Sequence, residues 1–226
     1  MTWWTAGGAS GIVGAYAPVG AANLAASYSN LANPGTYDAA PGVAPSFDTA
    51  TGWDFNGSTQ YLTTGITPTS GTWTALIRYS DGVAGDLLFG YYSSGAGAAF
   101  LVTLDTAQMR AANGQDFPAG YADNAPILTA GVYGFAGKTP YRNGVAEPVT
   151  ISATNNPLGS IYIGAGHVNG ADVGHANAKV QAFGIWNNTL TADQMAAVSA
   201  AMAALPTAAT SPLLSIMLAE AAAGYY

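Results

Sequence analysis

The sequence predicts an all-β sandwich that forms a single domain over residues 1–205. Short apolar or alternating runs are separated by Gly, Pro, Asn, Ser and Thr, a pattern typical of many short strands joined by turns. The chain holds 29 Gly and 12 Pro, and they are spread along its length. Half of the 226 residues are hydrophobic, which is enough for a sizeable core. Sandwiches of about 200–250 residues commonly form one domain.

Residues 1–50 are the looser part of this domain, with one strand expected at residues 12–17. We expect residues 23–46 to form a long ordered loop, because they are rich in Asn, Ala, Pro and Gly without a clear period. Four apolar side chains could fasten this loop to a sheet: Leu24, Tyr28, Leu31 and Tyr37.

The remaining strands are expected where apolar or alternating runs lie between turn residues. They are residues 52–55, 61–64, 72–79, 87–92, 98–104, 132–136, 145–151, 161–165 and 179–187. The run 72–79 alternates most clearly, with Trp73 and Tyr79 on one face. Asn143-Gly144 predicts a tight type I′ hairpin, because both central positions of that turn need a positive φ. Four aromatic side chains are expected in the core: Trp53, Trp73, Phe183 and Trp186.

One helix is expected within residues 190–205. Thr191 and Gln194 have the spacing of a capping box, in which each side chain satisfies a free backbone N–H of the other residue. An apolar stripe begins at Met195 and the helix ends before Pro206.

The tail, residues 206–226, predicts a second short helix at 212–223, with Pro212 as its first residue. This helix is apolar nearly all round, so it should pack either on its own domain or on a partner, such as a second copy of the chain. The assembly face would consist of Leu213, Leu214, Ile216, Met217 and Leu218.

Charge and composition exclude several classes of protein. Five Lys and Arg against 12 Asp and Glu give a net charge of −7, and so few cations cannot neutralise the phosphates of a nucleic acid. No apolar run approaches the roughly 18–20 residues of a membrane span. The N-terminus lacks the basic residues of a signal peptide, and the chain has no Cys for disulfides or thiolate sites.

Five segments together resemble the concanavalin A-like lectin/glucanase superfamily, in its laminin-G-like branch. These are residues 52–62 (GWDFNGSTQYL), 71–77 (GTWTALI), 141–145 (YRNGV), 161–165 (IYIGA) and 182–194 (AFGIWNNTLTADQ). The resemblance implies a jelly-roll sandwich of antiparallel strands with a short C-terminal helix and an apolar helical tail. Residues 15–38 are similar to the openings of such domains in environmental bacteriophages, which implies a virion or extracellular location.

Enzymes on this scaffold mostly cleave glycans, and the glucanases carry an E-x-D-x-E motif. Retaining hydrolysis needs two carboxyl groups about 5–5.5 Å apart. Glu147 and Glu220 are the only two Glu of the chain and match no such motif, so the sequence predicts no enzyme. A polysaccharide hydrolase or lyase stays open as an alternative, because Arg, Gln, His and Tyr are present.

A carbohydrate site is expected from Tyr residues beside turns and from the polar loop 166–175, since sugars stack on aromatic rings and bind polar groups. The candidates are Tyr91, Tyr92, Tyr121, His167, Asn169, Asp172 and His175. No cofactor is predicted. Calcium could bind near Asp48, Asp54 and Asn56, but the family positions that are often Asp are here Ser58 and Thr59.

These observations predict a non-catalytic module that binds glycan or a host surface, or has a structural role, on a phage particle. Its partners would be surface glycans, other virion subunits or copies of itself. The alternatives are a polysaccharide-cleaving enzyme and a purely structural subunit that assembles through residues 212–223.

Overall fold

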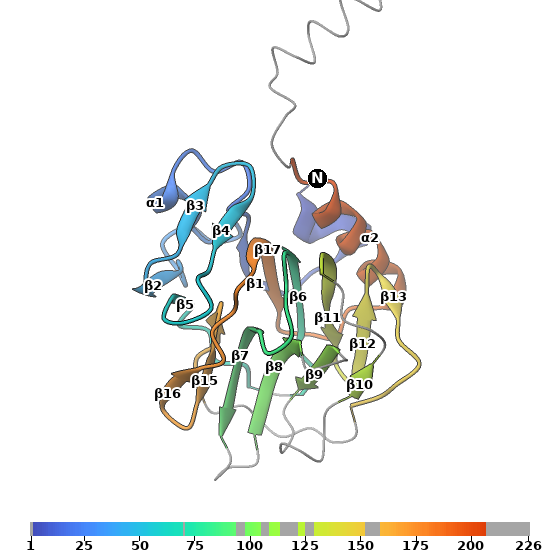
Figure 1. Cartoon of the computed structure of the whole chain (residues 1–226). Helices are drawn as coiled ribbons and strands as arrows, with labels where there is room; N and C mark the ends of the chain where they lie inside the picture. Colours follow the sequence, from blue (N-terminus) through green and yellow to red (C-terminus); the bar gives the residue numbers. More distant parts are fainter. Residues whose placement is uncertain are drawn as a thin grey trace, which may run out of the picture.

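Two antiparallel sheets packed face to face form the molecule (Figure 1), which confirms the prediction of an all-β sandwich. The computed structural model describes residues 2–69, 71–93, 98–104, 109–113, 122–124, 129–151 and 159–206. None of the helices in those ranges is long and apolar enough to cross a membrane. The tail with its expected assembly face lies outside the described residues.

The first sheet has the strand order β13-β12-β11-β6-β17-β4-β3, and β1 pairs with β17. Its strands are β1 (Ile12–Tyr16), β3 (Ser46–Asp48), β4 (Gly52–Asp54), β6 (Thr74–Ser80), β11 (Gly131–Ala136), β12 (Thr139–Arg142), β13 (Val145–Ala146) and β17 (Lys179–Trp186). The predicted strand at 145–151 is therefore only two residues long. The turn before it is the expected one, because Asn143 and Gly144 have φ of 49° and 82°.

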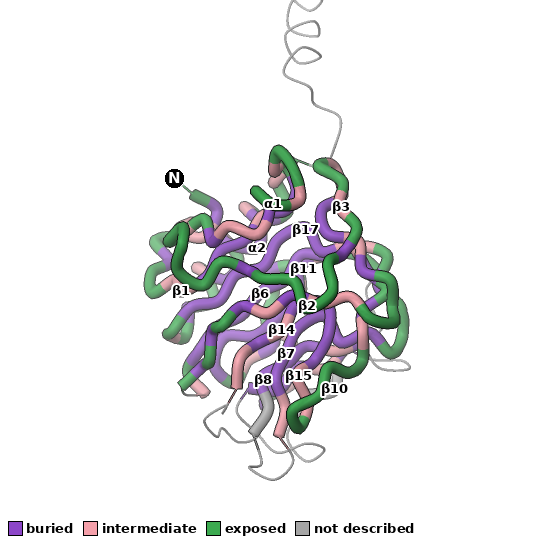
Figure 2. The backbone as a smooth tube through the Cα atoms, turned by 90° about the vertical axis from the view of Figure 1, so that its left-hand side faces the viewer, coloured by how far each residue is buried: buried purple, intermediate pink, exposed green. Residues whose placement is uncertain are grey.

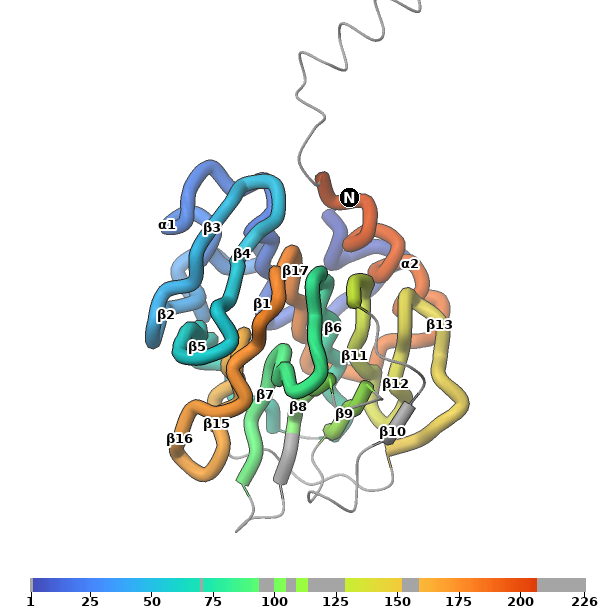
Figure 3. Tube along the Cα trace, in the orientation of Figure 1, coloured from blue at the N-terminus to red at the C-terminus, as the bar shows by residue number. Residues whose placement is uncertain are grey.

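The second sheet has the order β10-β9-β8-β7-β14-β5-β2, and a β15–β16 hairpin joins it at β7. Its strands are β2 (Ala40–Val43), β5 (Tyr61–Thr63), β7 (Leu87–Ser93), β8 (Ala98–Leu104), β9 (Met109–Asn113), β10 (Ala122–Asn124), β14 (Tyr162–Ile163), β15 (Gly166–Val168) and β16 (Ala171–Val173). The hairpin falls in a stretch that the sequence predicted as a polar loop. In Figure 3 the hairpin lies beside β7 at the lower edge of the molecule.

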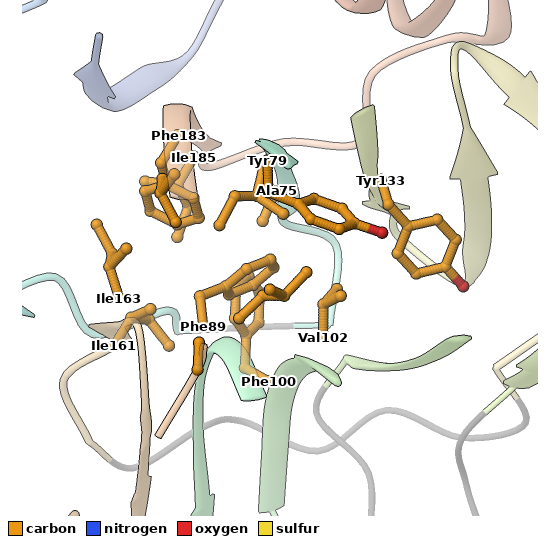
Figure 4. Close-up of a cluster of buried hydrophobic side chains, with 14 of the residues drawn as sticks. Ala75, Tyr79, Phe89, Phe100, Val102, Tyr133, Ile161, Ile163, Phe183 and Ile185 are labelled. Carbon is orange, nitrogen blue, oxygen red and sulfur yellow. The ribbon is translucent and has the colours of Figure 1, made fainter. Parts of the chain in front are cut away.

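The core lies between the sheets. Figure 4 shows Phe183 and Ile185 of β17 and Ala75 and Tyr79 of β6 facing Phe89 and Phe100 of the second sheet. The four aromatic residues expected in the core are all buried, with Trp53, Phe183 and Trp186 fully enclosed. Figure 2 shows the same arrangement as buried strands inside an exposed rim of loops.

The outer face of the first sheet is covered by two helices. These are α2 (Ala192–Ala203) and the 3-10 helix η1 (Trp3–Gly8), which contact each other and pack on that sheet. The capping box predicted for α2 is present: Thr191 Oγ1 accepts from Gln194 N, and Gln194 Oε1 accepts from Thr191 N. On the outer face of the second sheet, Leu87, Leu101 and Ala112 form a small buried cluster, with Tyr92 packed against it.

The loop at 23–46 is ordered around a buried Asn. Asn30 is fully enclosed; its Oδ1 accepts from Ala15 N and its Nδ2 donates to Val13 O and Thr36 O. The short helix α1 (Leu24–Ser27) lies in the same loop. Leu24 and Tyr28 pack against the core as expected. The expectation fails for Leu31 and Tyr37, which are 41% and 46% exposed, because the polar contacts of Asn30 hold the loop without them.

Candidate functional site

The β15–β16 hairpin lies beside β7 of the second sheet. β15 pairs in parallel with β7, in the register His167 to Tyr91 and Val168 to Tyr92. Gly166 allows the hairpin to pack closely on β7, because a Cβ at this position would lie 2.4 Å from the side chain of Leu87. The hairpin thus brings residues 166–175 to strands that are far away in the sequence.

Three aromatic rings form a stack on one side of β15. Tyr162 lies between Tyr61, with ring centroids 5.0 Å apart, and His167, at 4.6 Å with an angle of 5° between the planes. Tyr91 contacts His167 edge-on at 5.5 Å. Both faces of the Tyr162 ring are occupied, so this residue offers a ligand its hydroxyl group rather than a ring face.

A second imidazole extends the stack. His175 lies 6.1 Å from Tyr61 between ring centroids, and its Nε2 is 3.4 Å from Oδ2 of Asp172. The Nδ1 atoms of His167 and His175 are buried and have no hydrogen-bond partner among the described residues. We call Tyr61, Tyr162, His167, Asp172 and His175 the Tyr–His cluster.

Burial and neighbouring groups keep the phenol of Tyr162 neutral. Partial burial raises the pKa of Tyr162, and the neighbouring Tyr61 and Asp172 raise this pKa further. A neutral phenol can donate as well as accept a hydrogen bond. The cluster therefore combines donors and acceptors within a few ångströms at one rim of the sheet.

On the other side of β15 lies a hollow of about 220 Å³ with an almost wholly apolar lining, which we call the apolar hollow. It is lined by Leu87, Tyr92, Leu101, Thr103 and Val168. The hydroxyl of Thr103 already donates to the backbone oxygen of Asp86, at 2.9 Å. No charged side chain lines this hollow.

A more polar hollow of about 440 Å³ lies beyond the hairpin, where His175 and Asn177 meet the loop that carries Asp86. Asp86 is buried, and its carboxylate accepts from Val83 N and Asn177 N, both at 2.8 Å. Burial raises the pKa of Asp86, although these two hydrogen bonds lower it. Because both oxygens of Asp86 hold backbone groups, the carboxylate fastens two loops together.

The structure brings together four of the residues that the sequence singled out: Tyr91, His167, Asp172 and His175. Two others lie next to them. Tyr92 lines the apolar hollow, and the exposed Asn169 forms the hairpin turn, with its N–H donating to Tyr92 O. Tyr121 lies outside the described residues.

Two members of the Tyr–His cluster were missed, Tyr61 and Tyr162. A signal for them was present, because Leu62 and Ile163 are buried in the core and strand alternation turns their neighbours outward. The sequence could not show that the two tyrosines stack on each other, since about 100 residues separate them.

Two of the three calcium candidates, Asp48 and Asn56, serve as turn caps. Oδ1 of Asp48 accepts from Ala50 N and Thr51 N, and Oδ1 of Asn56 accepts from Ser58 N and Thr59 N. Asp54 ends β4, opposite Ser46. Within the described ranges, no three His, Asp or Glu side chains gather as metal ligands would.

The sequence contains two Glu residues that match no catalytic motif, and the structure describes one of them. Glu147 forms an ion pair with Arg142, Oε1 to Nε, at 2.7 Å. Glu220 lies outside the described residues.

No family model matches this sequence, and no curated protein matches it either. Solved structures share its fold. A mutant of Trypanosoma rangeli sialidase that displays trans-sialidase activity matches with a TM-score of 0.57 at 14% identity, over 87% of this chain and 34% of the sialidase. The sialidase in complex with sialic acid gives a TM-score of 0.54 at 15% identity, over 87% and 34%. The chain thus spans about a third of the length of these sialidases.

Another similar structure is much shorter than the sialidases, and the match covers almost all of it. Domain 4 of AbnA, a GH43 extracellular arabinanase from Geobacillus stearothermophilus, in complex with arabinotriose, matches with a TM-score of 0.55 at 12% identity. The match covers 83% of this chain and 98% of that domain. Similarity at this level of identity establishes the fold.

These similarities correct two predictions. The prediction of a non-catalytic module on a phage particle is wrong, because the similar structures are sialidases and an arabinanase domain, which point to glycan processing or carbohydrate binding. The prediction that the chain is not an enzyme is corrected by the same sialidases. The prediction rested on the absence of an E-x-D-x-E motif, and this absence excludes only one catalytic arrangement.

Proposed function

We propose that this chain acts in glycan processing and that it binds saccharides at the Tyr–His cluster. One observation carries the proposal: phenol, imidazole and carboxylate groups from β5, β14, the β15–β16 hairpin and His175 just after it meet at one rim of the second sheet. The two imidazole Nδ1 atoms are buried, so a ligand there would meet the phenol hydroxyl groups and the carboxylate of Asp172, whose side chain is 44% exposed.

Saccharides fit this set of groups. Each hydroxyl of a sugar both donates and accepts, and neutral phenols, imidazoles and carboxylates offer the complementary atoms in a compact space. Binding sites usually join a few such polar groups to apolar surface, and the apolar hollow lies directly across β15. The arabinanase domain in complex with arabinotriose supports the proposal. So does the resemblance of the sequence to concanavalin A-like lectins and glucanases.

A specific observation favours cleavage at the same site as a second candidate. Oδ2 of Asp172 lies 3.4 Å from Nε2 of His175. A carboxylate that orients an imidazole is a common arrangement for moving a proton.

Binding is tested on a glycan array, followed by calorimetry with the best ligands. Tyr162→Phe removes one hydroxyl and retains the stack, and Asp172→Asn removes the charge beside His175. Each substitution should weaken binding by about five- to tenfold, as expected for the loss of one hydrogen bond of about 1–1.5 kcal/mol. Tyr37→Asn is the control: Tyr37 is an exposed tyrosine outside the cluster with φ of 59°, which Asn tolerates. Unchanged affinity in both cluster variants would refute the assignment of the site.

Cleavage is tested with the same ligands by assays for new reducing ends and for unsaturated products. We expect activity that His175→Ala abolishes while circular dichroism shows an intact fold. If the wild-type protein releases no product from any glycan that it binds, cleavage at this cluster is excluded and binding remains.

A further inference from the structure

We propose that a hollow beside the end of α2 is a second binding site, which takes a carboxylate or sulfate group. The hollow has a volume of about 370 Å³, and its polar lining consists of Arg78, Ser80, Asn143 and Gln181. It lies on the outer face of the first sheet, where α2 contacts β6, β11 and β13 (Figure 1). We call it the Arg78 hollow. It shares no residue with the Tyr–His cluster, so the proposal does not depend on saccharide binding there.

Arg78 brings a buried positive charge without a carboxylate partner to this hollow. The residue is 9% exposed, and the partners of its head group are the backbone oxygens of Met202 and Leu205, both bound by Nη1. No ion pair involves it in the described part of the chain. Carbonyl groups at a helix C-terminus carry only a partial negative charge, and a buried charge is costly without a full counter-charge. An anion in the hollow would supply it.

Several donors of the lining are free to bind this anion. Nε and Nη2 of Arg78 have no partner among the described residues, and neither is a fully enclosed atom, so both remain accessible. The amide of Gln181, a residue that is 8% exposed, is accessible and unpartnered in the same way. Nδ2 of Asn143 is also free, because the orientation of this side chain is fixed by Oδ1, which accepts from Val132 N.

Strand geometry gathers these donors from distant parts of the chain. Arg78 and Ser80 are two residues apart in β6, so their side chains lie on the same face of the sheet. Gln181 is the extra residue of a bulge in β17, opposite β6, and bulges redirect the side chains that they carry. Asn143 belongs to the turn between β12 and β13. Guanidinium, amide and hydroxyl groups all donate to the oxygens of an anion.

The lining of the Arg78 hollow repels no anion. Among the described residues, none of those that line it is acidic, although the net charge of the chain is −7. Carboxylates of neighbouring segments already have cationic partners. Asp81, which directly follows β6, lies 2.6 Å from Lys179, Oδ2 to Nζ. Glu147 pairs with Arg142. The free donors and the uncompensated cation therefore favour a planar carboxylate or a sulfate, which a guanidinium binds through two parallel hydrogen bonds.

NMR of protein with isotope-labelled arginine tests the site directly, because the chain has only three arginines: Arg78, Arg110 and Arg142. The Nε–H signal of Arg78 is identified by its loss in Arg78→Lys. Titration with methyl β-D-glucuronide or sodium sulfate should shift this signal saturably. Methyl β-D-glucoside, which has a hydroxymethyl group in place of the carboxylate, should not shift it, and neither should sodium chloride at equal ionic strength. Saturation by one of the two anions is sufficient, and its identity distinguishes a bound carboxylate from a free inorganic ion.

Two substitutions link the shift to the hollow without removing the contacts of Arg78 with α2. Asn143→Asp keeps an oxygen acceptor for Val132 N and tolerates the φ of 49°. It places a negative charge beside the anion and should weaken binding by about tenfold or more. Gln181→Leu removes one neutral donor and should weaken binding by about two- to tenfold. Asn33→Asp is the matched control, because Asn33 is exposed and does not line the hollow; its affinity should stay within about twofold of the wild type.

Several results would overturn the proposal. It fails if neither anion gives a saturable shift, or if both Asn143→Asp and Gln181→Leu bind like the wild type. An equal loss in Asn143→Asp and Asn33→Asp also overturns it, because the effect would then follow the net charge of the protein. The Tyr–His cluster is tested by Tyr162→Phe and Asp172→Asn, which leave the Arg78 hollow unchanged. Failure of one site is therefore distinguishable from failure of the other.

Discussion

Replacement of Arg78 by Met should destabilise the protein by about 2–3 kcal/mol. Arg78 lies on the outer face of the first sheet under the end of α2, and only 9% of it is exposed. One of its guanidinium nitrogens, Nη1, donates to Met202 O at 2.7 Å and to Leu205 O at 2.9 Å. A strand residue thus supplies the positive charge at the C-terminus of this helix, where α2 has no basic residue of its own.

The magnitude follows from opposing contributions. Hydrogen bonds from a charged donor contribute about 1.5–3 kcal/mol each, and a cation at a helix C-terminus adds about 0.3–1 kcal/mol. Burial works against them, because it lowers the pKa of Arg78 and therefore disfavours the charged form. Met fills a similar volume, so the packing of the aliphatic stem should be largely preserved and the loss should come from the head group.

Urea denaturation followed by circular dichroism measures this difference. A loss of about 2–3 kcal/mol corresponds to a fall in Tm of roughly 4–12 °C for a domain of this size. Arg78→Lys is the control that keeps a charge, and it should lose less than the Met variant. If Arg78→Met is within about 0.5 kcal/mol of the wild type, the guanidinium does not stabilise α2 and the reasoning is refuted.

Three further predictions follow from the packing. Asn30→Ala should cost about 3–4 kcal/mol, because several buried backbone groups lose their partner at once, and chemical denaturation would reveal it; a loss under about 1 kcal/mol would show that the loop does not depend on this side chain. Gly134→Ala should prevent folding or severely destabilise the protein, because its Cβ would lie 1.9 Å from Ala75 O in the adjacent strand; soluble protein with a wild-type Tm would contradict this. Burial raises the pKa of Asp86 in the folded state above the usual value of an aspartate, so protonation favours folding and this contribution is lost as pH rises through the raised folded pKa. Urea midpoints should therefore fall over the interval just above pH 3.8, and Asp86→Asn should flatten that part of the profile; identical profiles for the two proteins would argue against a raised pKa.

Much of the fold could be predicted because its signals are local. The capping box of Thr191 and Gln194 and the turn at Asn143-Gly144 depend only on neighbouring residues, and both are present. Alternation placed strand 74–80 correctly for the same reason. The β15–β16 hairpin was missed, since its strands of three residues are too short to show a period and are held by pairing with β7.

The candidate site could be predicted only in part. The sequence by itself determined an all-β sandwich with a capped C-terminal helix, and it singled out His167, Asp172 and His175 as polar loop residues. Only the tertiary structure decided that Tyr61 and Tyr162 join them, because stacking across strands depends on the order of the strands in the sheet. Tertiary packing also determined the role of Arg78, which caps a helix more than a hundred residues away. Local chemistry determines which elements form, and long-range pairing determines which side chains meet, since such contacts leave no periodic trace in a single sequence.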